Sequence, residues 1–403
     1  MLTRALVPHV EVSVILMRKL LPRFLYPGKE RVGKTLTTLS SADYAPTFDG
    51  VDWYLVPSIL KATRFLLHHR PDIIILQWWT GAVLVPYSWL GFLVRKRGGR
   101  VIVEFHEDQD TGEAAFRSAA RIGQWGVRRL ISSATALVVH SEWDRERLSR
   151  LFGLDGQLFR VIPHGPYPMV VDPSRLAADV EMVPRPERTL DNAVVSPDKI
   201  ERAGQASVRG GNLGPLAEQS NDDETVVTVL FFGTIRPYKG LEDLVTAFEL
   251  LPRDAKSVWR LLVVGETWEG WHLPIENIKN SRHRGDIELV NRYVSDAEVA
   301  TYFARADIVA LPYLRSSASG PLHLAMSAGL PVVITRVGGL VEAAQDYSGT
   351  VFASPHDPEA LARAIAEATR LTGIRHAEKQ TWDEVAKSYG ALFEKILPSS
   401  QMR

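Results

Sequence analysis

Two positively charged side chains, Arg236 and Lys239, lie in a glycine-bounded loop that directly follows the apolar run 225–232. Arginine can hold phosphate oxygens with two parallel hydrogen bonds, and lysine attracts them as a point charge. A second segment, residues 311–342, reads as an apolar strand, a Ser/Gly loop, an alanine-rich helix, another strand and a Gly-Gly turn. A helix that begins in such a loop exposes backbone N–H groups, which also attract an anion. Together the two segments predict a site for a phosphate-containing ligand.

A histidine, His106, ends the β-branched run 100–105 and is followed by the carboxylates Glu107, Asp108 and Asp110. This order places His106 at the carboxyl end of a parallel strand, where open α/β sheets bind ligands. We expect it to position or hydrogen-bond a substrate rather than to attack one. The three carboxylates either bind a substrate hydroxyl or cap a helix. We predict no metal site, because no further ligands are recognisable in the sequence.

Composition favours a large enzyme-sized protein over a small binding module. The chain has 403 residues and no cysteine, which excludes disulfides, a thiolate nucleophile and cysteine-based metal sites and fits the cytoplasm. Its net charge is zero, but residues 1–170 carry 22 Lys and Arg against 15 Asp and Glu. This basic half is either a solvated surface or a face for an anionic membrane or a phosphorylated acceptor. Nothing in the sequence indicates a nucleic-acid partner.

Strands and helices alternate along the chain, which predicts an α/β protein with parallel sheets covered on both faces. The first half is expected to hold strands near 10–16, 73–79, 100–105, 136–140 and 160–162, and helices near 58–69, 111–132 and 142–152. The second half is expected to hold strands near 225–232, 260–264 and 287–293, helices near 241–251 and 296–306, and a helix opened by Asp357 and Pro358. Ser295 and Glu298 form the pattern of a capping box.

A polar stretch divides the chain. Residues 171–224 are broken by prolines at 173, 184, 186 and 197 and have a Gly/Asn/Asp-rich end, and they are typical of an exposed linker or insertion. We therefore predict an acceptor-side Rossmann-like domain over 1–170, this linker, and a second domain over 225–380 that binds the phosphate-containing ligand. Residues 381–403 are expected to form a helix that packs back toward the first domain.

The uncharged stretch 73–94 is long enough to cross a bilayer, but polar residues, a proline and glycines interrupt it. A buried strand followed by a separate helix is therefore the favoured interpretation. Its aromatic residues precede a basic triplet and permit peripheral contact with a membrane. These residues are Trp78, Trp79, Tyr87 and Trp89, followed by Arg95, Lys96 and Arg97.

Several motifs occur together in one order: PDIIILQWW, VIVEFHE, ALVVHSEWDRERL and RVIPHG, then FFGTIRPYKGLEDLVTAF, VVGE, YVSDAEVATYFARADIVALPY and SGPLHLAMSAGLPVVITRVGGLVE. In this order they resemble glycosyltransferase family 4. The resemblance implies a GT-B fold, with two Rossmann-like domains facing an interdomain cleft. It also implies a retaining glycosyltransferase that moves a sugar from a nucleotide-sugar donor to a glycan or lipid-linked acceptor, without a metal ion or other cofactor. The protein would then be cytoplasmic, with membrane association left open.

The resemblance assigns roles to residues of this chain. Catalytic roles fall on His106, Arg236 and Lys239. In such an enzyme the hydroxyl bound by Glu107, Asp108 and Asp110 would belong to the acceptor. Donor binding falls on Gly233, Thr234, Gly265, Glu266, Val294, Ser316, Ser319, Gly320, Pro321, Leu322 and His323.

The chain also departs from the family pattern. Ser316 and Leu324 stand where relatives have two glutamates, and Thr234 rather than an arginine follows Gly233. Residues 2–9 resemble the end of the family's first helix, so the first βα unit is expected to be missing. These departures keep two alternatives open: a nucleotide-sugar epimerase of GT-B fold, and a non-catalytic nucleotide-sugar-binding protein.

Overall fold

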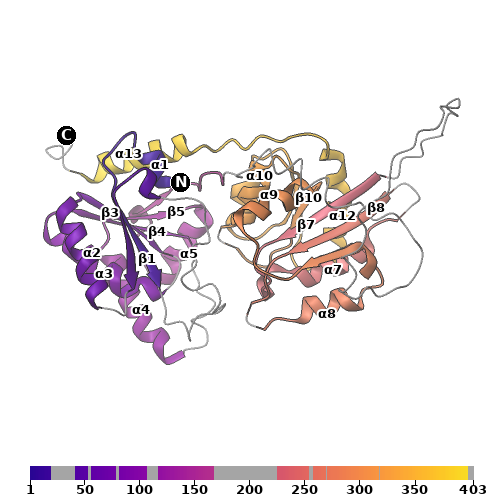
Figure 1. Cartoon of the computed structure of the whole chain (residues 1–403), viewed down its shortest axis with the longest axis horizontal. Helices are drawn as coiled ribbons and strands as arrows, with labels where there is room; N and C mark the ends of the chain where they lie inside the picture. Colours follow the sequence, from indigo (N-terminus) through magenta and orange to yellow (C-terminus); the bar gives the residue numbers. More distant parts are fainter. Residues whose placement is uncertain are drawn as a thin grey trace, which may run out of the picture.

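The computed structural model describes residues 1–19, 41–52, 56–78, 81–106, 117–167, 225–253, 257–268, 270–316 and 318–397. These residues form two lobes, each built on parallel strands with helices around them (Figure 1). The first lobe contains the elements up to residue 167, and the second contains those from residue 225 onward. The last helix, α13 (Trp382–Ile396), returns to the first lobe. The α/β class predicted from the sequence is confirmed.

The described part of the first lobe holds six parallel strands in two sheets. Four strands form one sheet in the order β3-β4-β5-β6, and β1 and β2 form a separate pair. Val101, Ile102 and Val103 of β4 are fully buried, because this strand has a neighbour on each side and is covered on both faces. The strands are β1 Val14–Lys19, β2 Thr47–Asp52, β3 Ile73–Trp78, β4 Arg100–Phe105, β5 Ala136–Val139 and β6 Phe159–Val161.

The sequence does not predict β2, and it places β1 too early. The β2 segment, TFDGVD, contains two aspartates and a glycine, which strands disfavour, and it lacks an apolar run. The strand expected over 10–16 begins at Val14 instead.

The first-lobe helices are α1 Leu2–Leu6, α2 Val56–His69, α3 Leu84–Lys96, α4 Arg117–Ser132 and α5 Glu142–Phe152. Local chemistry fixes both ends of α5. The Ser141 hydroxyl accepts from the Asp144 N–H at 3.1 Å, and Gly153 adopts the left-handed conformation that ends the helix. The stretch 73–94 divides into β3 and α3, with residues 79–80 outside the described residues. Within the described ranges, no helix is long and apolar enough to span a membrane.

The second lobe is a six-stranded parallel sheet in the order β12-β11-β10-β7-β8-β9. The chain enters in the middle at β7, moves outward to β9, and then returns to β10 on the other side of β7. This reversal creates a switch point between β7 and β10, where doubly wound sheets bind ligands at the carboxyl ends of the strands. The strands are β7 Thr225–Phe232, β8 Ser257–Val264, β9 Ile287–Val290, β10 Ile308–Leu311, β11 Val332–Thr335 and β12 Thr350–Ala353.

Helices cover both faces of this sheet. Phe231 points into a core built with α7, α8 and α12, and its neighbour Leu230 points into a second core with α9, α10 and α11. The capping box of Ser295 and Glu298 is present at α9, and Asp357 caps α12 at 2.8 Å. The helices are α7 Leu241–Leu250, α8 Leu273–Asn280, α9 Asp296–Ala304, α10 Gly320–Ser327, α11 Gly339–Ala344 and α12 Pro358–Ala368.

Helix α13 belongs to the core of the first lobe. Its residues Val385, Tyr389 and Leu392 are buried with Ile102 of β4 and Val138 of β5. Residues 168–224 lie outside the described residues, so the domain boundaries at 170, 224 and 380 stay predictions.

Candidate functional site

The loops after β7 and β8 are joined by backbone hydrogen bonds. The Gly233 N–H donates to Val264 at 3.0 Å, and the Ile235 N–H donates to Glu266 at 2.9 Å. Gly265 approaches so closely that a Cβ atom there would lie 1.8 Å from the carbonyl oxygen of Gly233, and its φ is +158°. Glycine is therefore required at 265, because any side chain would separate the two loops.

Lys239 lies at the switch point between β7 and β10. It ends a 3-10 turn, Pro237–Lys239, and Gly240 follows in the left-handed conformation, against the carbonyl oxygen of Pro312. The Lys239 side chain is buried, and its ammonium lies 3.7 Å from the centre of the Tyr313 ring. A ring face attracts a cation, so the Tyr313 ring holds this ammonium between the two loops.

Arg236 also rests on an aromatic face. Its guanidinium carbon lies 4.4 Å from the centre of the Trp268 ring, and the Trp268 indole donates to the Glu266 carboxylate at 3.3 Å. The structure thus brings together Arg236, Glu266 and Gly233, which the sequence placed on two different strand ends.

The loop after β10 reaches the same place. Pro321 at the start of α10 lies close to Gly233, where a Cβ atom would meet the proline ring at 3.4 Å. The Ser319 hydroxyl caps α10 by accepting from the Leu322 N–H at 3.2 Å, and the Ser316 hydroxyl donates to Ala318 at 2.9 Å. Both hydroxyls therefore hold the loop in shape at the start of α10.

Two predicted donor contacts have buried side chains. Leu322 is fully buried, and Val294 is 6% exposed, both within the core under α9 and α10. Only backbone atoms at these two positions can contact a donor. Glu107, Asp108 and Asp110 lie outside the described residues.

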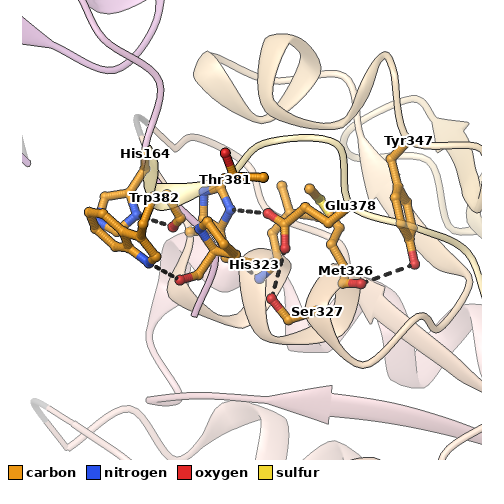
Figure 2. Close-up of polar contacts among 12 residues, drawn as sticks. His164, His323, Met326, Ser327, Tyr347, Glu378, Thr381 and Trp382 are labelled. Atoms are coloured by element: carbon orange, nitrogen blue, oxygen red, sulfur yellow. Dashed lines mark hydrogen bonds and ion pairs between the residues drawn. The ribbon is translucent and has the colours of Figure 1, made fainter. Parts of the chain in front are cut away.

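His323 faces the junction of the lobes (Figure 2). Its Nδ1 lies 3.2 Å from a Glu378 oxygen, and the other Glu378 oxygen accepts from Ser327 at 2.7 Å. The opposite side of its ring meets His164 of the first lobe, with ring centres 5.3 Å apart. Trp382 closes this contact by donating to the carbonyl oxygen of Pro166 at 2.7 Å. His323 therefore joins the two lobes in this structure, and a role in donor binding stays a prediction.

In the first lobe, His106 meets two residues that the sequence analysis did not assign. His140 follows β5 as His106 follows β4, and the two rings are hydrogen-bonded at 3.2 Å. Glu104 lies two residues before His106, and its Oε1 is 3.7 Å from Nε2 of each ring. The strand-end argument used for His106 would also have found His140, because their strands are neighbours.

Burial determines the ionisation of this group. It raises the pKa of Glu104 to about 7, and it lowers the pKa of His106 to about 4 and that of His140 to about 3. The pKa of His164 is also lowered by burial, to about 4. All three imidazoles are thus neutral at physiological pH.

A cavity between the lobes lies in a different place. It has a volume of about 650 Å³ and lies among α1, α9 and the start of α13, with Arg4, Tyr167 and Arg375 in its wall. None of the residues predicted to bind a donor lines it.

Comparison with known proteins identifies the fold and the chemistry. Residues 1–165 match a family described as glycosyl transferase 4-like domain, and residues 226–370 match one described as glycosyl transferases group 1. The O-antigen chain mannosyltransferase B of Escherichia coli is 28% identical over 341 residues, 83% of this chain and 75% of that protein. This chain belongs to the family 4 glycosyltransferases.

Solved structures agree with the fold of this glycosyltransferase. Sucrose-phosphate synthase from Thermosynechococcus elongatus superimposes with a TM-score of 0.61, at 16% identity, over 98% of this chain and 91% of that one. Anabaena HepE in complex with UDP-glucose gives a TM-score of 0.56, at 15% identity, over 96% of each chain. The two lobes are therefore the two Rossmann-like domains of a GT-B fold. The epimerase and the non-catalytic binding protein are not favoured.

Proposed function

We propose that this glycosyltransferase moves a sugar, with retention of configuration, from a nucleoside-diphosphate sugar to a glycan or lipid-linked acceptor. The observation that carries the proposal is the Lys239 ammonium, held 8% exposed where the loops after β7 and β10 meet. A diphosphate placed there would gain negative charge as the bond to the sugar breaks. A fixed cation in a site that excludes water stabilises that charge strongly.

Other residues take roles that follow from their positions. Arg236, supported on the Trp268 ring, would hold a second phosphate oxygen with its planar fork. Backbone N–H groups at the start of α10 would complete the phosphate contacts. These groups supply the positive charge that the leaving group needs, so the proposed reaction uses no metal ion or other cofactor. His106 would contact a hydroxyl of the donor sugar or the acceptor.

The similarity to HepE, which was solved with UDP-glucose, supports a nucleotide-sugar donor. The identity of the donor's nucleotide base is tested by a thermal-shift screen of UDP, GDP and ADP sugars. A donor at one hundred times its dissociation constant should add about 2.7 kcal/mol to the free energy of unfolding. Transfer is then measured as release of the nucleoside diphosphate in the presence of acceptor glycans and polyprenyl-linked sugars.

Lys239→Ala should remove the donor-induced shift, because it deletes the buried cation. Lys279→Ala is the matched control, since Lys279 is an exposed lysine of α8 in the same lobe. An equal shift in Lys239→Ala and in the control would contradict the proposed site. Donor hydrolysis or transfer that requires added Mg²⁺ would contradict the metal-free reaction.

We further propose that the face formed by α2 and α3 docks on the anionic, cytoplasmic surface of a membrane to reach a lipid-linked acceptor. Trp89 and Phe92 of α3 are 42% and 46% exposed, and Val56 of α2 is 68% exposed. The Trp89 indole donates to Thr63 of α2 at 2.9 Å, which joins the two helices. The other two aromatic residues that the structure describes in this stretch, Trp78 and Tyr87, are buried and cannot take part.

Charge supports the same face. Arg95, Lys96 and Arg97 are exposed at the carboxyl end of α3, beside the apolar residues. Each basic residue near an anionic surface contributes about 1 kcal/mol to binding. Co-sedimentation should show binding to vesicles with phosphatidylglycerol at low salt. The double variant Trp89→Ser/Phe92→Ser should lose it, and Ile374→Ser, an exposed apolar residue of the second lobe, should not. Equal binding of both variants would contradict this docking face.

A further inference from the structure

The ring of Tyr313 faces the cation of the candidate site. The Lys239 ammonium lies 3.7 Å from the centre of this ring, and the ring of Tyr238 is a second one, with its centre 5.3 Å from the same ammonium. The face of an aromatic ring carries partial negative charge, and it attracts a cation most strongly where water is excluded. Tyr313 and Lys239 are both buried, so the contact lies in such a place.

The backbone on both sides of Tyr313 is fixed to the turn that carries the ammonium. The Leu314 N–H donates to the carbonyl oxygen of Tyr238 at 2.8 Å. On the other side, the carbonyl oxygen of Pro312 lies so close to Gly240 that a Cβ atom there would be 2.0 Å from it. The loop that supplies the ring and the turn that supplies the ammonium are therefore held at one separation.

Two hydrogen bonds hold Tyr313 from the other elements of the lobe. Its carbonyl oxygen accepts from the Thr335 hydroxyl at the end of β11. Its phenol oxygen accepts from the Ser319 hydroxyl at 3.4 Å, and Ser319 in turn accepts from the Leu322 N–H at the start of α10. The ring is thus anchored to β11 and to the first turn of α10.

These contacts give the ammonium a defined place before a ligand arrives. Lysine carries its charge on a flexible stem, which loses its freedom of rotation when the ammonium is fixed. With the ring in place, that loss occurs on folding instead of on binding. A cation that is already in position stabilises developing negative charge well, because nothing has to reorganise during the reaction.

We propose that Tyr313 is a positioning residue whose anchored ring holds the Lys239 ammonium at the place where the diphosphate of the donor binds. The diphosphate rests on the proposed function. The place of the ammonium depends only on the protein, so the two can be tested separately.

The place of the ammonium is read by NMR on the full chain labelled with ¹³C-lysine, with the Lys239 signals assigned from their loss in Lys239→Arg. The protons beside the ammonium should appear upfield of those of an exposed lysine such as Lys279, because they lie over the face of a ring. Tyr313→Phe should keep this displacement, and Tyr313→Leu should abolish it. Native Lys239 signals at the position of an exposed lysine would overturn the proposal, even if neither variant folds.

Nucleotide binding gives an independent measure. Calorimetry with UDP, GDP and ADP identifies the diphosphate that the native protein binds. Tyr313→Leu should raise the Kd of that nucleotide by about tenfold or more, and Tyr313→Phe by much less. Tyr347→Leu is the matched control, since Tyr347 is another buried tyrosine of the same core, and it should leave the Kd unchanged. If Tyr313→Leu raises the Kd no more than Tyr347→Leu or Tyr313→Phe does, the ring has no positioning role.

A ring of similar shape but opposite charge distribution separates attraction from packing. Pentafluorophenylalanine at position 313 fills nearly the same space as phenylalanine, but its fluorine atoms withdraw electrons and leave the ring face positive. It should raise the Kd to the level of Tyr313→Leu. A Kd equal to that of Tyr313→Phe would show that only packing matters and would overturn the proposal. Native protein that shows the expected Lys239 signals but binds none of the three diphosphates would refute the proposed function alone.

Discussion

Glu104→Gln is expected to stabilise this glycosyltransferase, and more so at alkaline pH. Burial raises the pKa of the Glu104 carboxyl from 4.5 to about 7 in the folded protein. Between these two values the folded chain holds a proton that the unfolded chain has released, so stability falls as pH rises through this window. Glutamine keeps the shape, stays neutral, and still offers an oxygen to the Gln77 amide, 3.0 Å away in the native protein.

The magnitude follows from the width of the window. One pKa unit corresponds to about 1.36 kcal/mol, so burial of Glu104 costs about 3 kcal/mol at pH 8, where the carboxyl is ionised, and about 1 kcal/mol at pH 5, where the folded protein keeps it protonated. The buried histidines act in the opposite sense, because their pKa values are lowered. Stability rises with pH between about 4, the folded pKa of His106, and 6.5. This contribution is common to variant and native protein, so their difference isolates Glu104.

The assay is urea unfolding of both proteins at pH 5 and pH 8 at equal ionic strength. Glu104→Gln should gain about 2 kcal/mol more at pH 8 than at pH 5. Glu146→Gln is the matched control, since Glu146 is exposed on α5 and a neutral change there should alter stability little. If the difference in the free energy of unfolding between Glu104→Gln and the native protein is the same at both pH values, or if the variant is less stable at pH 8, the reasoning is refuted.

Two further substitutions test contacts around the site. Gly265→Ala should lower the free energy of unfolding by about 2 kcal/mol or more, because its Cβ atom would lie 1.8 Å from the carbonyl oxygen of Gly233. It should also abolish donor binding in the thermal-shift assay. Gly285→Ala is the control, since a Cβ atom there meets open space, and it should fold and bind the donor normally in the same assay. Glu342→Ala should lower the free energy of unfolding by about 1 kcal/mol, as measured with urea. The Glu342 carboxylate of α11 accepts hydrogen bonds from the N–H groups of residues 142 and 143 at 2.6 and 2.8 Å, and so caps α5 of the other lobe. A loss no larger than that of Glu276→Ala, which changes an exposed residue of α8, would contradict this capping role.

The local sequence pattern was sufficient to predict an element where one hydrophobic period or one helix cap dominates. The continuous apolar run over Thr225–Phe232 and the buried run over Arg100–Phe105 have the strand bounds that the sequence predicts. The helix Glu142–Phe152 also begins and ends as predicted, because Ser141 caps it and Gly153 ends it. The strand Thr47–Asp52 could not be predicted, because its aspartates and glycine are tolerated only through its pairing with a distant segment.

The site was predictable in its location but not in its side chains. The strand-end rule brings Gly233, Lys239 and His106 to the carboxyl ends of their sheets, as the structure shows. It cannot tell which side chains turn into the core, which is why Leu322 was expected at the donor and is fully buried. The contact of His323 with His164 also has no local signal, because it depends on how the two lobes meet.

The two lobes differ in the charge of the side chains that they place at the candidate site. The second lobe holds Lys239 and Arg236 against aromatic faces, 3.7 Å and 4.4 Å from the ring centres of Tyr313 and Trp268. The first lobe instead holds the rings of His106 and His140, which burial keeps neutral and which are hydrogen-bonded to each other at 3.2 Å. A cation on this side would compete for the phosphates, and an exposed carboxylate would repel them. Glu104 is buried beside these rings, and burial raises its pKa to about 7. The free energy of unfolding near neutral pH is therefore the quantity most sensitive to this site.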